Sequence, residues 1–430
     1  MARDGWHTSP QTHLRIFSSN GPAALTLNGL PTRWPIAGTE CQYTKPRRLA
    51  ASCAVARAFQ KGSMRSNVSA TEFVSSYTGA ASNAEHLHSE IIMAKMKVVQ
   101  VPKAGGDFEL VEREIPAPGA GQVRIKVQAC GICFSDHLVK DGHWPGLQYP
   151  RVPGHEVAGV IDELGGGVTR WKKGDRVGVG WHGGHDNICP ACRAGDFINC
   201  ENEKITGFAF DGGYQEYMIA PIEAIARIPD ALDPAEAAPL LCAGITTYNV
   251  LRHSGALPGD LVAVQGIGGL GHLGIQFANK FGYRVVAVGR GPENASLTKK
   301  LGAHEYIDSK AANAAQELQK LGGAKVILAT APSSKAMSEI FGGLGRNGKL
   351  LVIGADVSAP LEIPSVGLIM GNKGIQGWAS GTANDSEDTL RFAALTGVRP
   401  MIERFPLVKA ADAYERMNSG HAQFRVVLTM

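Results

Sequence analysis

Three short segments, far apart in the sequence, carry side chains that bind zinc well. Cys130 and Cys133 share the segment CGICFSD, His155 stands in GHE, and Cys242 comes just before AGITT. Taken singly, each has a simpler explanation, because buried cysteines and turn histidines are common without any metal. Together they supply two thiolates and one imidazole, a three-ligand set that leaves one zinc position open for water or substrate. Asp136, in the first segment, is placed to orient a ligand histidine.

A second group of donors has the spacing D-x2-C-x2-C-x7-C, and consists of Asp186, Cys189, Cys192 and Cys200. Three thiolates and one carboxylate can close a tetrahedral zinc site, and a closed site is structural. The chain contains eight cysteines, and in a protein of this length without a secretory signal this usage favours metal ligation over disulfides. The alternative is a loop of reduced thiols without a metal.

A glycine-rich turn stands between a strand pattern and a helix pattern. The apolar run 261–264 predicts a buried strand, and Gly266, Gly268 and Gly271 follow it in G-x-G-x-x-G spacing. Such a turn lets a pyrophosphate approach the backbone at the N-terminus of the next helix. We therefore expect a dinucleotide here.

The end of the next expected strand bears on which dinucleotide binds. Gly289 and Arg290 stand where an NAD site usually has an acidic residue for the ribose 2′-hydroxyl. Arginine instead accommodates a 2′-phosphate, so this position favours NADP over NAD. The alternative is a surface arginine that tolerates either cofactor.

The elements that would position these groups fall into two types. From residue 261 onward strands and helices alternate, which predicts a doubly wound parallel α/β sheet of the Rossmann type. The expected strands are 261–265, 284–288, 305–308, 325–329 and 349–353 with a sixth at 374–378, and the expected helices are 272–281, 293–301, 311–320 and 335–344. Before them, short strands at 97–101, 123–129, 157–161, 176–179 and 214–219 between Gly and Pro turns predict a β-rich domain. After them, helices at 385–395 and 409–419 and a strand at 424–428 are expected.

Charge and hydropathy exclude several classes of protein. The net charge of the 430 residues is +4, and residues 1–92 account for it, with nine basic and five acidic side chains. The balanced remainder gives no reason to expect nucleic-acid binding. No apolar run approaches the roughly 18 residues of a membrane helix, so no membrane partner is expected.

Residues 1–92 are rich in Ser, Ala, Thr, Asn and Arg and lack a sustained apolar period, which predicts a disordered or targeting extension. Arg57, Lys61 and Arg65 would form one stripe of a helix, and the basic, serine-rich composition is typical of a mitochondrial transit peptide. The competing interpretations are a solvated extension, or upstream sequence that is not part of the working protein, with Met93 or Met96 a natural start for the folded part. In either of these cases we expect a cytoplasmic protein.

From about residue 96 to residue 430 the combined motifs resemble the zinc-dependent medium-chain alcohol dehydrogenases. The resemblance implies a GroES-like catalytic domain at 93–241, a Rossmann domain at 242–373 and a return to the catalytic domain at 374–430. It also implies a catalytic zinc on Cys133, His155 and Cys242, with Glu156 a carboxylate that can move onto the metal.

Further roles follow from the same resemblance. Ser135 would pass on the alcohol proton, with Asp136 and Glu156 beside it, while His143 and Trp144 would line the substrate pocket. Arg425 would reach the cofactor pyrophosphate. The implied cofactor-binding residues are Thr246, Gly266, Gly268, Gly269, Leu270, Gly271, Gly289, Arg290 and Arg425.

The chain departs from the family pattern in two places. Asp186 stands where relatives carry a fourth lobe cysteine, and carboxylate oxygen also binds zinc. Relatives often have a relay histidine three residues after the serine, whereas here Leu138 occupies that place and His137 stands one residue early. Whether His137 joins the proton path is left open.

The resulting hypothesis is an enzyme that transfers hydride between a primary or secondary alcohol and NAD(P), and reduces aldehydes in reverse. It would hold two zinc ions per chain, prefer NADP over NAD, act on small molecules and form a homodimer or homotetramer. The alternatives are a zinc-free quinone or enoyl reductase of the same fold, or a non-catalytic structural or redox-sensing relative.

Overall fold

A six-stranded parallel sheet forms the nucleotide half of the protein, whose computed structural model describes residues 94–430. Its strand order is β10-β9-β8-β11-β12-β13, the doubly wound arrangement expected for a Rossmann fold. The strands are β8 (Leu261–Gln265), β9 (Arg284–Gly289), β10 (Glu305–Asp308), β11 (Ala324–Ala329), β12 (Leu344–Val352) and β13 (Gly374–Gly377).

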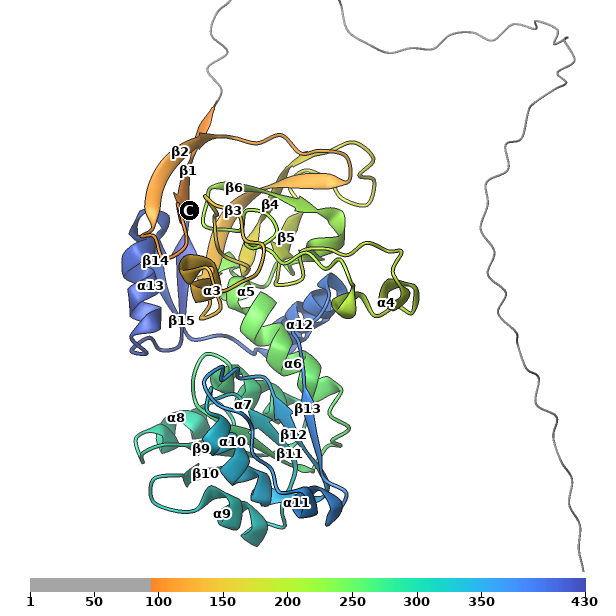
Figure 1. The fold of residues 1–430 in the computed structure, drawn as a ribbon, viewed down its shortest axis with the longest axis vertical. Helices are drawn as coiled ribbons and strands as arrows, with labels where there is room; N and C mark the ends of the chain where they lie inside the picture. The colour runs from red at the N-terminus through yellow and green to blue at the C-terminus, as the bar shows by residue number, and fades with distance from the viewer. Residues whose placement is uncertain (1–93) are drawn as a thin grey trace, which may run out of the picture. The chain divides into compact units, whose positions relative to one another are not determined.

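Apolar side chains cover both faces of this sheet. Alternate residues of β8 belong to two different cores, with Val262 and Val264 in one and Leu261 and Ala263 in the other. A strand buried on both faces reads as a continuous apolar run, which explains why β8 could be predicted from sequence. The helices of this half are α7 (Gly271–Lys280), α8 (Asn294–Lys300), α9 (Ala314–Lys320), α10 (Ser334–Ile340) and α11 (Ser365–Ile369) (Figure 1).

A second sheet, largely antiparallel, forms the β-rich half. Its order is β14-β15-β3-β4-β5-β7, with β6 paired to β3, while β1 and β2 form a separate hairpin. The C-terminal strand β15 lies between β14 and β3, so the end of the chain completes this sheet. The strands are β1 (Lys95–Gln100), β2 (Glu109–Glu114), β3 (Gln122–Ile132), β4 (Val157–Leu164), β5 (Arg176–Val179), β6 (Tyr217–Pro221), β7 (Ile225–Arg227), β14 (Ile402–Pro406) and β15 (Arg425–Thr429).

Short helices accompany this sheet, and one apolar core joins it to the Rossmann sheet. That core contains Ala129 and Val427 from the β-rich half together with Val262 and Leu273 from the nucleotide half. The shared core fixes how the metal donors and the glycine turn face one another. The helices are α3 (Asp136–Asp141), α4 (Pro190–Arg193), α5 (Pro234–Pro239), α6 (Ile245–Arg252), α12 (Ala383–Thr396) and α13 (Ala410–Asn418), with a π-helical turn at Leu240–Gly244 ahead of α6.

The structure confirms the predicted fold class and corrects several elements. The helix expected at 335–344 ends at Ile340, because Gly342 and Gly343 interrupt it and Leu344 already begins β12. The sequence analysis missed β2, whose residues ELVERE are mostly polar, as well as the three-residue β7 and the proline-ending β14. The interpretations of residues 1–92 lie outside the described residues. Among the described helices, none has the length and apolar character needed to cross a membrane.

Candidate active site and cofactor cleft

Four donor side chains meet at one point of the β-rich half. One ligand atom from each of Cys133, His155, Glu156 and Cys242 lies within 4.8 Å of the others, and the two sulfurs are 3.8 Å apart. The three zinc donors implied by the family resemblance are therefore brought together. Cys130 is buried on the same strand but is not part of this cluster.

Neighbouring elements explain how residues so distant in sequence converge. Strand β3 pairs antiparallel with β4, with Cys130 opposite Val157, so Cys133 beyond the end of β3 comes close to His155 ahead of β4. Gly131 admits the carboxylate, because a Cβ there would lie 1.9 Å from Oε2 of Glu156. Cys242 arrives on the π-helical turn, a distortion found often at functional sites.

Asp136 holds the histidine and the loop. Its Oδ1 lies 3.3 Å from Nδ1 of His155, and its Oδ2 accepts hydrogen bonds from the backbone N–H of Cys133 (2.9 Å) and the hydroxyl of Tyr214 (2.8 Å). These contacts leave Nε2 of His155 facing the donor cluster, where it lies 3.4 Å from Oγ of Ser135. Orientation of a ligand histidine by a carboxylate is a common arrangement in metal sites.

The donors of the cluster are strongly coupled to one another. A hydrogen bond with Cys242 and the nearby His155 hold the pKa of Cys133 well below its usual value. The same hydrogen bond, together with burial, raises the pKa of Cys242 well above its usual value. Burial alone would lower the pKa of His155, but Cys133 and Asp136 raise it well above its usual value. A thiolate, a thiol and an imidazole therefore share protons at one point, and a metal that binds there would displace those protons.

Glu156 and Arg425 form a buried ion pair beside the cluster. Arg425 donates to Oε1 of Glu156 and also, at 3.2 Å, to the carbonyl of Ile132. Burial raises the pKa of Glu156 to about 7, although Arg425 lowers it. The other carboxylate oxygen, Oε2, is buried without a hydrogen-bond partner, so it is available to a metal.

Ser135 and His137 lie on the side of the donor cluster that faces the large cavity described below. The hydroxyl of Ser135 lies 3.2 Å from Sγ of Cys133. The ring of His137 is held by its Nδ1 against the carbonyl of Phe134 at 2.7 Å. Within residues 94–430 no hydrogen bond joins Ser135 to His137.

Aromatic rings lie next to the histidine of the cluster. Trp181 packs edge to face on the His155 ring, with centroids 5.0 Å apart, and Trp144 and Phe208 pack on Trp181 at 6.2 and 5.1 Å. Trp144 therefore contacts the cluster only through Trp181 and is itself 37% exposed, and His143 is exposed and lies 6.0 Å from His137. Neither of these two predicted substrate-pocket residues lines the large cavity described below. Sequence reasoning missed Trp181, which follows β5 by two residues; its only signal was an aromatic residue at the end of a strand.

The second donor group also converges. One ligand atom each of Asp186, Cys189, Cys192 and Cys200 lies within 4.8 Å of the others, and the three cysteines are buried. Backbone N–H groups of Asp186 and Asn202 donate to the Cys200 sulfur at 3.4 and 3.3 Å. Hydrogen bonds from Asn202 and from the backbone N–H groups of Cys189 and Ile188 lower the pKa of Asp186. The group therefore offers a carboxylate to the same point as the three sulfurs.

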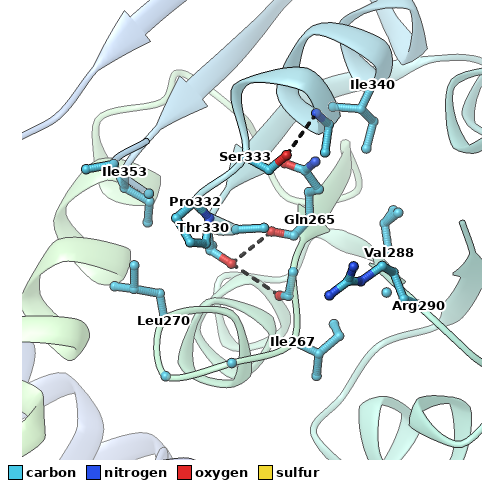
Figure 2. Close-up of a pocket in the computed structure, with 18 of the residues that line it drawn as sticks. Gln265, Ile267, Leu270, Val288, Arg290, Thr330, Pro332, Ser333, Ile340 and Ile353 are labelled. Atoms are coloured by element: carbon cyan, nitrogen blue, oxygen red, sulfur yellow. Dashed lines mark hydrogen bonds between the residues drawn. The ribbon is translucent and has the colours of Figure 1, made fainter. Parts of the chain in front are cut away.

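A cavity of about 1690 Å³ runs from the first donor cluster to the carboxyl ends of the Rossmann strands. Gly266 lines it with a φ of +96°, and Thr330 donates to the carbonyls of Gln265 and Gly266 at 2.8 and 3.2 Å (Figure 2). Gly271 permits helix α7 to begin against the turn, because a Cβ there would lie 1.8 Å from the Gly266 carbonyl oxygen. By contrast, the Cα of Gly268 faces open space, as a close approach by a phosphate requires.

Other predicted cofactor residues line the same cavity, namely Thr246, Gly269, Leu270, Gly289, Arg290 and Arg425. Arg425 spans both sites, since its Nη1 lies 2.8 Å from where a Gly269 Cβ would stand while Nη2 binds Glu156. In Figure 2 the exposed Arg290 side chain extends from the end of β9 toward the glycine turn. Ser309 and Lys310, after β10, also line this end of the cavity and were missed by the sequence analysis.

Comparisons with known proteins agree with this architecture. Residues 119–230 match the alcohol dehydrogenase GroES-like domain family, and residues 269–394 match the zinc-binding dehydrogenase family. The chain is 46% identical over 327 residues to alcohol dehydrogenase patD of Penicillium expansum, covering 76% of this chain and 95% of that protein. It is 38% identical over 337 residues to an alcohol dehydrogenase of Geobacillus stearothermophilus, covering 78% and 99%.

A solved structure gives the same picture. The cobalt- and zinc-bound thermostable alcohol dehydrogenase of Pyrobaculum aerophilum superimposes with a TM-score of 0.70 at 28% identity, covering 78% of this chain and all of that one. The chain belongs to the zinc-dependent medium-chain alcohol dehydrogenase family and is an oxidoreductase.

Proposed function

We propose that the protein is an NADP-preferring, zinc-dependent alcohol dehydrogenase that interconverts primary or secondary alcohols with aldehydes or ketones. The observation that carries this proposal is the convergence of Cys133, His155, Glu156 and Cys242 at the end of the cofactor cavity. A zinc-free quinone or enoyl reductase would have no use for these four converging donors. A non-catalytic structural or redox-sensing relative would bind the cofactor in this cavity but turn over no alcohol, so turnover separates the two.

The donor set fits zinc. Cys133, His155 and Cys242 would hold the ion, and the unpartnered Oε2 of Glu156 offers a further ligand. An ion held there would supply Lewis acidity toward the alcohol oxygen, and a dinucleotide held at the glycine turn would supply the hydride chemistry.

The chain's own residues position the reaction and move the proton. Ser135 lines the cavity beside the cluster, so its hydroxyl would accept the alcohol proton while it passes its own proton on to water in the cavity. Asp136 keeps Nε2 of His155 turned to the metal position. Trp181 packs on the His155 ring and would keep it in place, with Trp144 and Phe208 behind it. Phe134 and Leu138 line the cavity next to Ser135, and these apolar side chains support an apolar substituent on the substrate.

The second donor group supports a structural zinc, which gives two zinc ions per chain. Its three sulfurs and one carboxylate leave no position for substrate, and backbone N–H groups donate to the Cys200 sulfur. Asp186 would replace the fourth cysteine that relatives carry.

The proposed NADP preference rests on Arg290. We expect Arg290→Asp to raise KM for NADP by about 10- to 100-fold, because it removes a charge-assisted bond to the 2′-phosphate and adds a repelling carboxylate. KM for NAD should change by less than about 3-fold. Initial rates with both cofactors measure this. The matched control is Lys300→Asp, the same charge change at an exposed residue of α8 that does not line the cavity. If Arg290→Asp raises KM for NADP and for NAD equally, Arg290 does not distinguish the two cofactors and the proposed NADP preference is wrong.

Self-association into a homodimer or homotetramer is part of the proposal. Strand β13 forms one edge of the Rossmann sheet and exposes Ile375, and the adjacent α11 exposes Val366 and Ile369. An apolar patch along an unpaired strand edge favours pairing with a second copy. Sedimentation velocity of the purified chain measures the assembly.

The domain boundaries at 241/242 and 373/374 and a cytoplasmic or mitochondrial location stay predictions.

Steady-state assays with a panel of alcohols and aldehydes and both cofactors test the proposed function. We expect NADP-linked oxidation of at least one primary or secondary alcohol, and loss of that activity when zinc is removed by a chelator. Turnover of quinones or enones that survives zinc removal would favour the reductase alternative.

A further inference from the structure

His272 is a fully buried titratable side chain that the proposed mechanism does not use. It directly follows Gly271, the last glycine of the turn, in the first turn of α7, and its Nδ1 lies 2.9 Å from the Gly268 carbonyl. Its Nε2 accepts a hydrogen bond from the backbone N–H of Met401 at 3.2 Å. Because Nε2 is the acceptor, Nδ1 carries the proton and donates to Gly268. Burial lowers the pKa of His272 to about 4, so the ring is neutral and keeps this tautomer.

Met401 continues the connection toward the donor cluster. Its carbonyl accepts hydrogen bonds from the backbone N–H groups of Phe424 and Arg425, both at 3.0 Å, and the Phe424 ring packs on His272 with centroids 4.9 Å apart. The Arg425 side chain then binds Glu156 of the donor cluster. A continuous series of hydrogen bonds thus runs from the glycine turn to the metal donors through one imidazole ring.

We propose that His272 is a positioning residue that couples cofactor binding at the glycine turn to the placement of Arg425 and Glu156 at the metal centre. The inference rests on the proposed function, since it takes the glycine turn to be the cofactor site. A dinucleotide that fixes Gly268 would also fix His272, Met401 and the backbone of Arg425. By linkage, the arrangement of Arg425 and Glu156 would in turn change the affinity for the dinucleotide.

The next turn of the same helix provides a matched control. The Gln276 amide donates to the carbonyls of His272 (3.1 Å) and Arg399 (2.9 Å), and its oxygen accepts from the Arg399 N–H at 3.2 Å. Gln276 therefore ties α7 to the segment at 399–401 as His272 does, but none of its hydrogen bonds reaches the glycine turn. It also shows that a glutamine in this helix can donate to the carbonyl four residues back and accept from the neighbouring segment at once.

The first experiment compares dinucleotide affinity in three variants of the zinc-loaded protein, by isothermal titration with NADP and NAD. His272→Phe keeps a ring against Phe424 but loses both hydrogen bonds, and should raise Kd by about 10-fold. His272→Gln should restore affinity to within about 3-fold, and Gln276→Met should stay within about 2-fold of wild type. Melting temperatures identify any general loss of stability. If His272→Phe does not fold, His272→Asn, whose shorter side chain cannot reach both partners, replaces it.

The second experiment is a double-mutant cycle on the same Kd with Glu156→Gln. If the two sites are coupled, the fold increase in Kd of the double variant His272→Phe/Glu156→Gln should be at least about 3-fold smaller than the product of the fold increases of the two single variants. Three results would each overturn the coupling. The first is a Kd of the double variant equal to the product of the single effects, and the second is an equal change in Kd in His272→Phe and Gln276→Met. The third is a failure of His272→Gln to restore the affinity. If the wild-type protein binds neither NADP nor NAD, the proposed function is wrong. If the wild-type protein binds a dinucleotide and the His272 variants bind it equally well, only the coupling is wrong.

Discussion

Replacing His155 by alanine should remove one zinc ion per chain and lower kcat/KM for alcohol oxidation by at least about 1000-fold. The imidazole is one of only three side chains that would hold the ion permanently, and its loss leaves two thiolates and the ion-paired Glu156. Metal analysis of the variant should show one zinc where wild type has two. The melting temperature should also fall, because the substitution leaves a cavity at a fully buried position, but the second zinc ion should remain because its donor group is untouched.

Cys130→Ala is the matched control for this prediction. Cys130 is a buried cysteine on β3, three residues from Cys133, but it is not part of the donor cluster. The control should keep both zinc ions and most of the activity, at a stability cost of about 1 kcal/mol from the lost packing. Full activity in His155→Ala, or zinc loss in Cys130→Ala, would show that the cluster has been assigned incorrectly.

Replacing Cys192 by alanine should remove the other zinc ion and act mainly on stability. Cys192 is buried in a small cluster with Cys189, Cys200, Ala191 and Phe197, so few apolar contacts hold this lobe without a metal. A structural zinc contributes its binding energy to folding, so we expect a fall in melting temperature of at least about 5 °C. Differential scanning calorimetry with metal analysis measures both effects.

Asp186→Cys tests the same lobe in the opposite direction. It supplies a fourth thiolate at the place where relatives carry one, and should keep two zinc ions per chain with a melting temperature at or above that of wild type. If Cys192→Ala retains two zinc ions and its melting temperature, the lobe is a loop of unliganded thiols.

The nucleotide half could be predicted closely because local signals suffice there. The bounds of β8 and β10 agree with those predicted from the sequence, since the apolar run of β8 ends before Gly266 and a turn follows Asp308 at the end of β10. The glycine spacing has a local steric cause: Gly266 takes a positive φ, and Gly271 lies against the Gly266 carbonyl. Polar or very short strands such as β2 and β7 carry no such signal.

The meeting of the donors could not be derived from spacing alone. Cys133 and His155 come together only because β3 and β4 pair in one register, and Cys242 only because an apolar core joins the two sheets. The resemblance to a family supplied that ligand set. The roles of Trp181 and His272 depend on contacts between segments more than 25 residues apart, such as His272 with Met401, which no local pattern predicts.

Arg425 is another residue whose contacts could not be predicted from local sequence patterns. The sequence analysis assigned it to the cofactor pyrophosphate, and the structure places its guanidinium on Glu156 while Nη1 lies near Gly269. A buried arginine facing two sites is visible only once β15 takes its place beside β3. The pyrophosphate contact stays a prediction, and the double-mutant cycle with Glu156→Gln bears on it.

Anomalous diffraction from crystals of the purified protein at the zinc absorption edge tests the central claim most directly. We predict two zinc peaks per chain, one among Cys133, His155 and Cys242 beside the cofactor cavity and one among Asp186, Cys189, Cys192 and Cys200. A map without a peak at the first position, from protein that turns over alcohol at its full rate, would contradict the account.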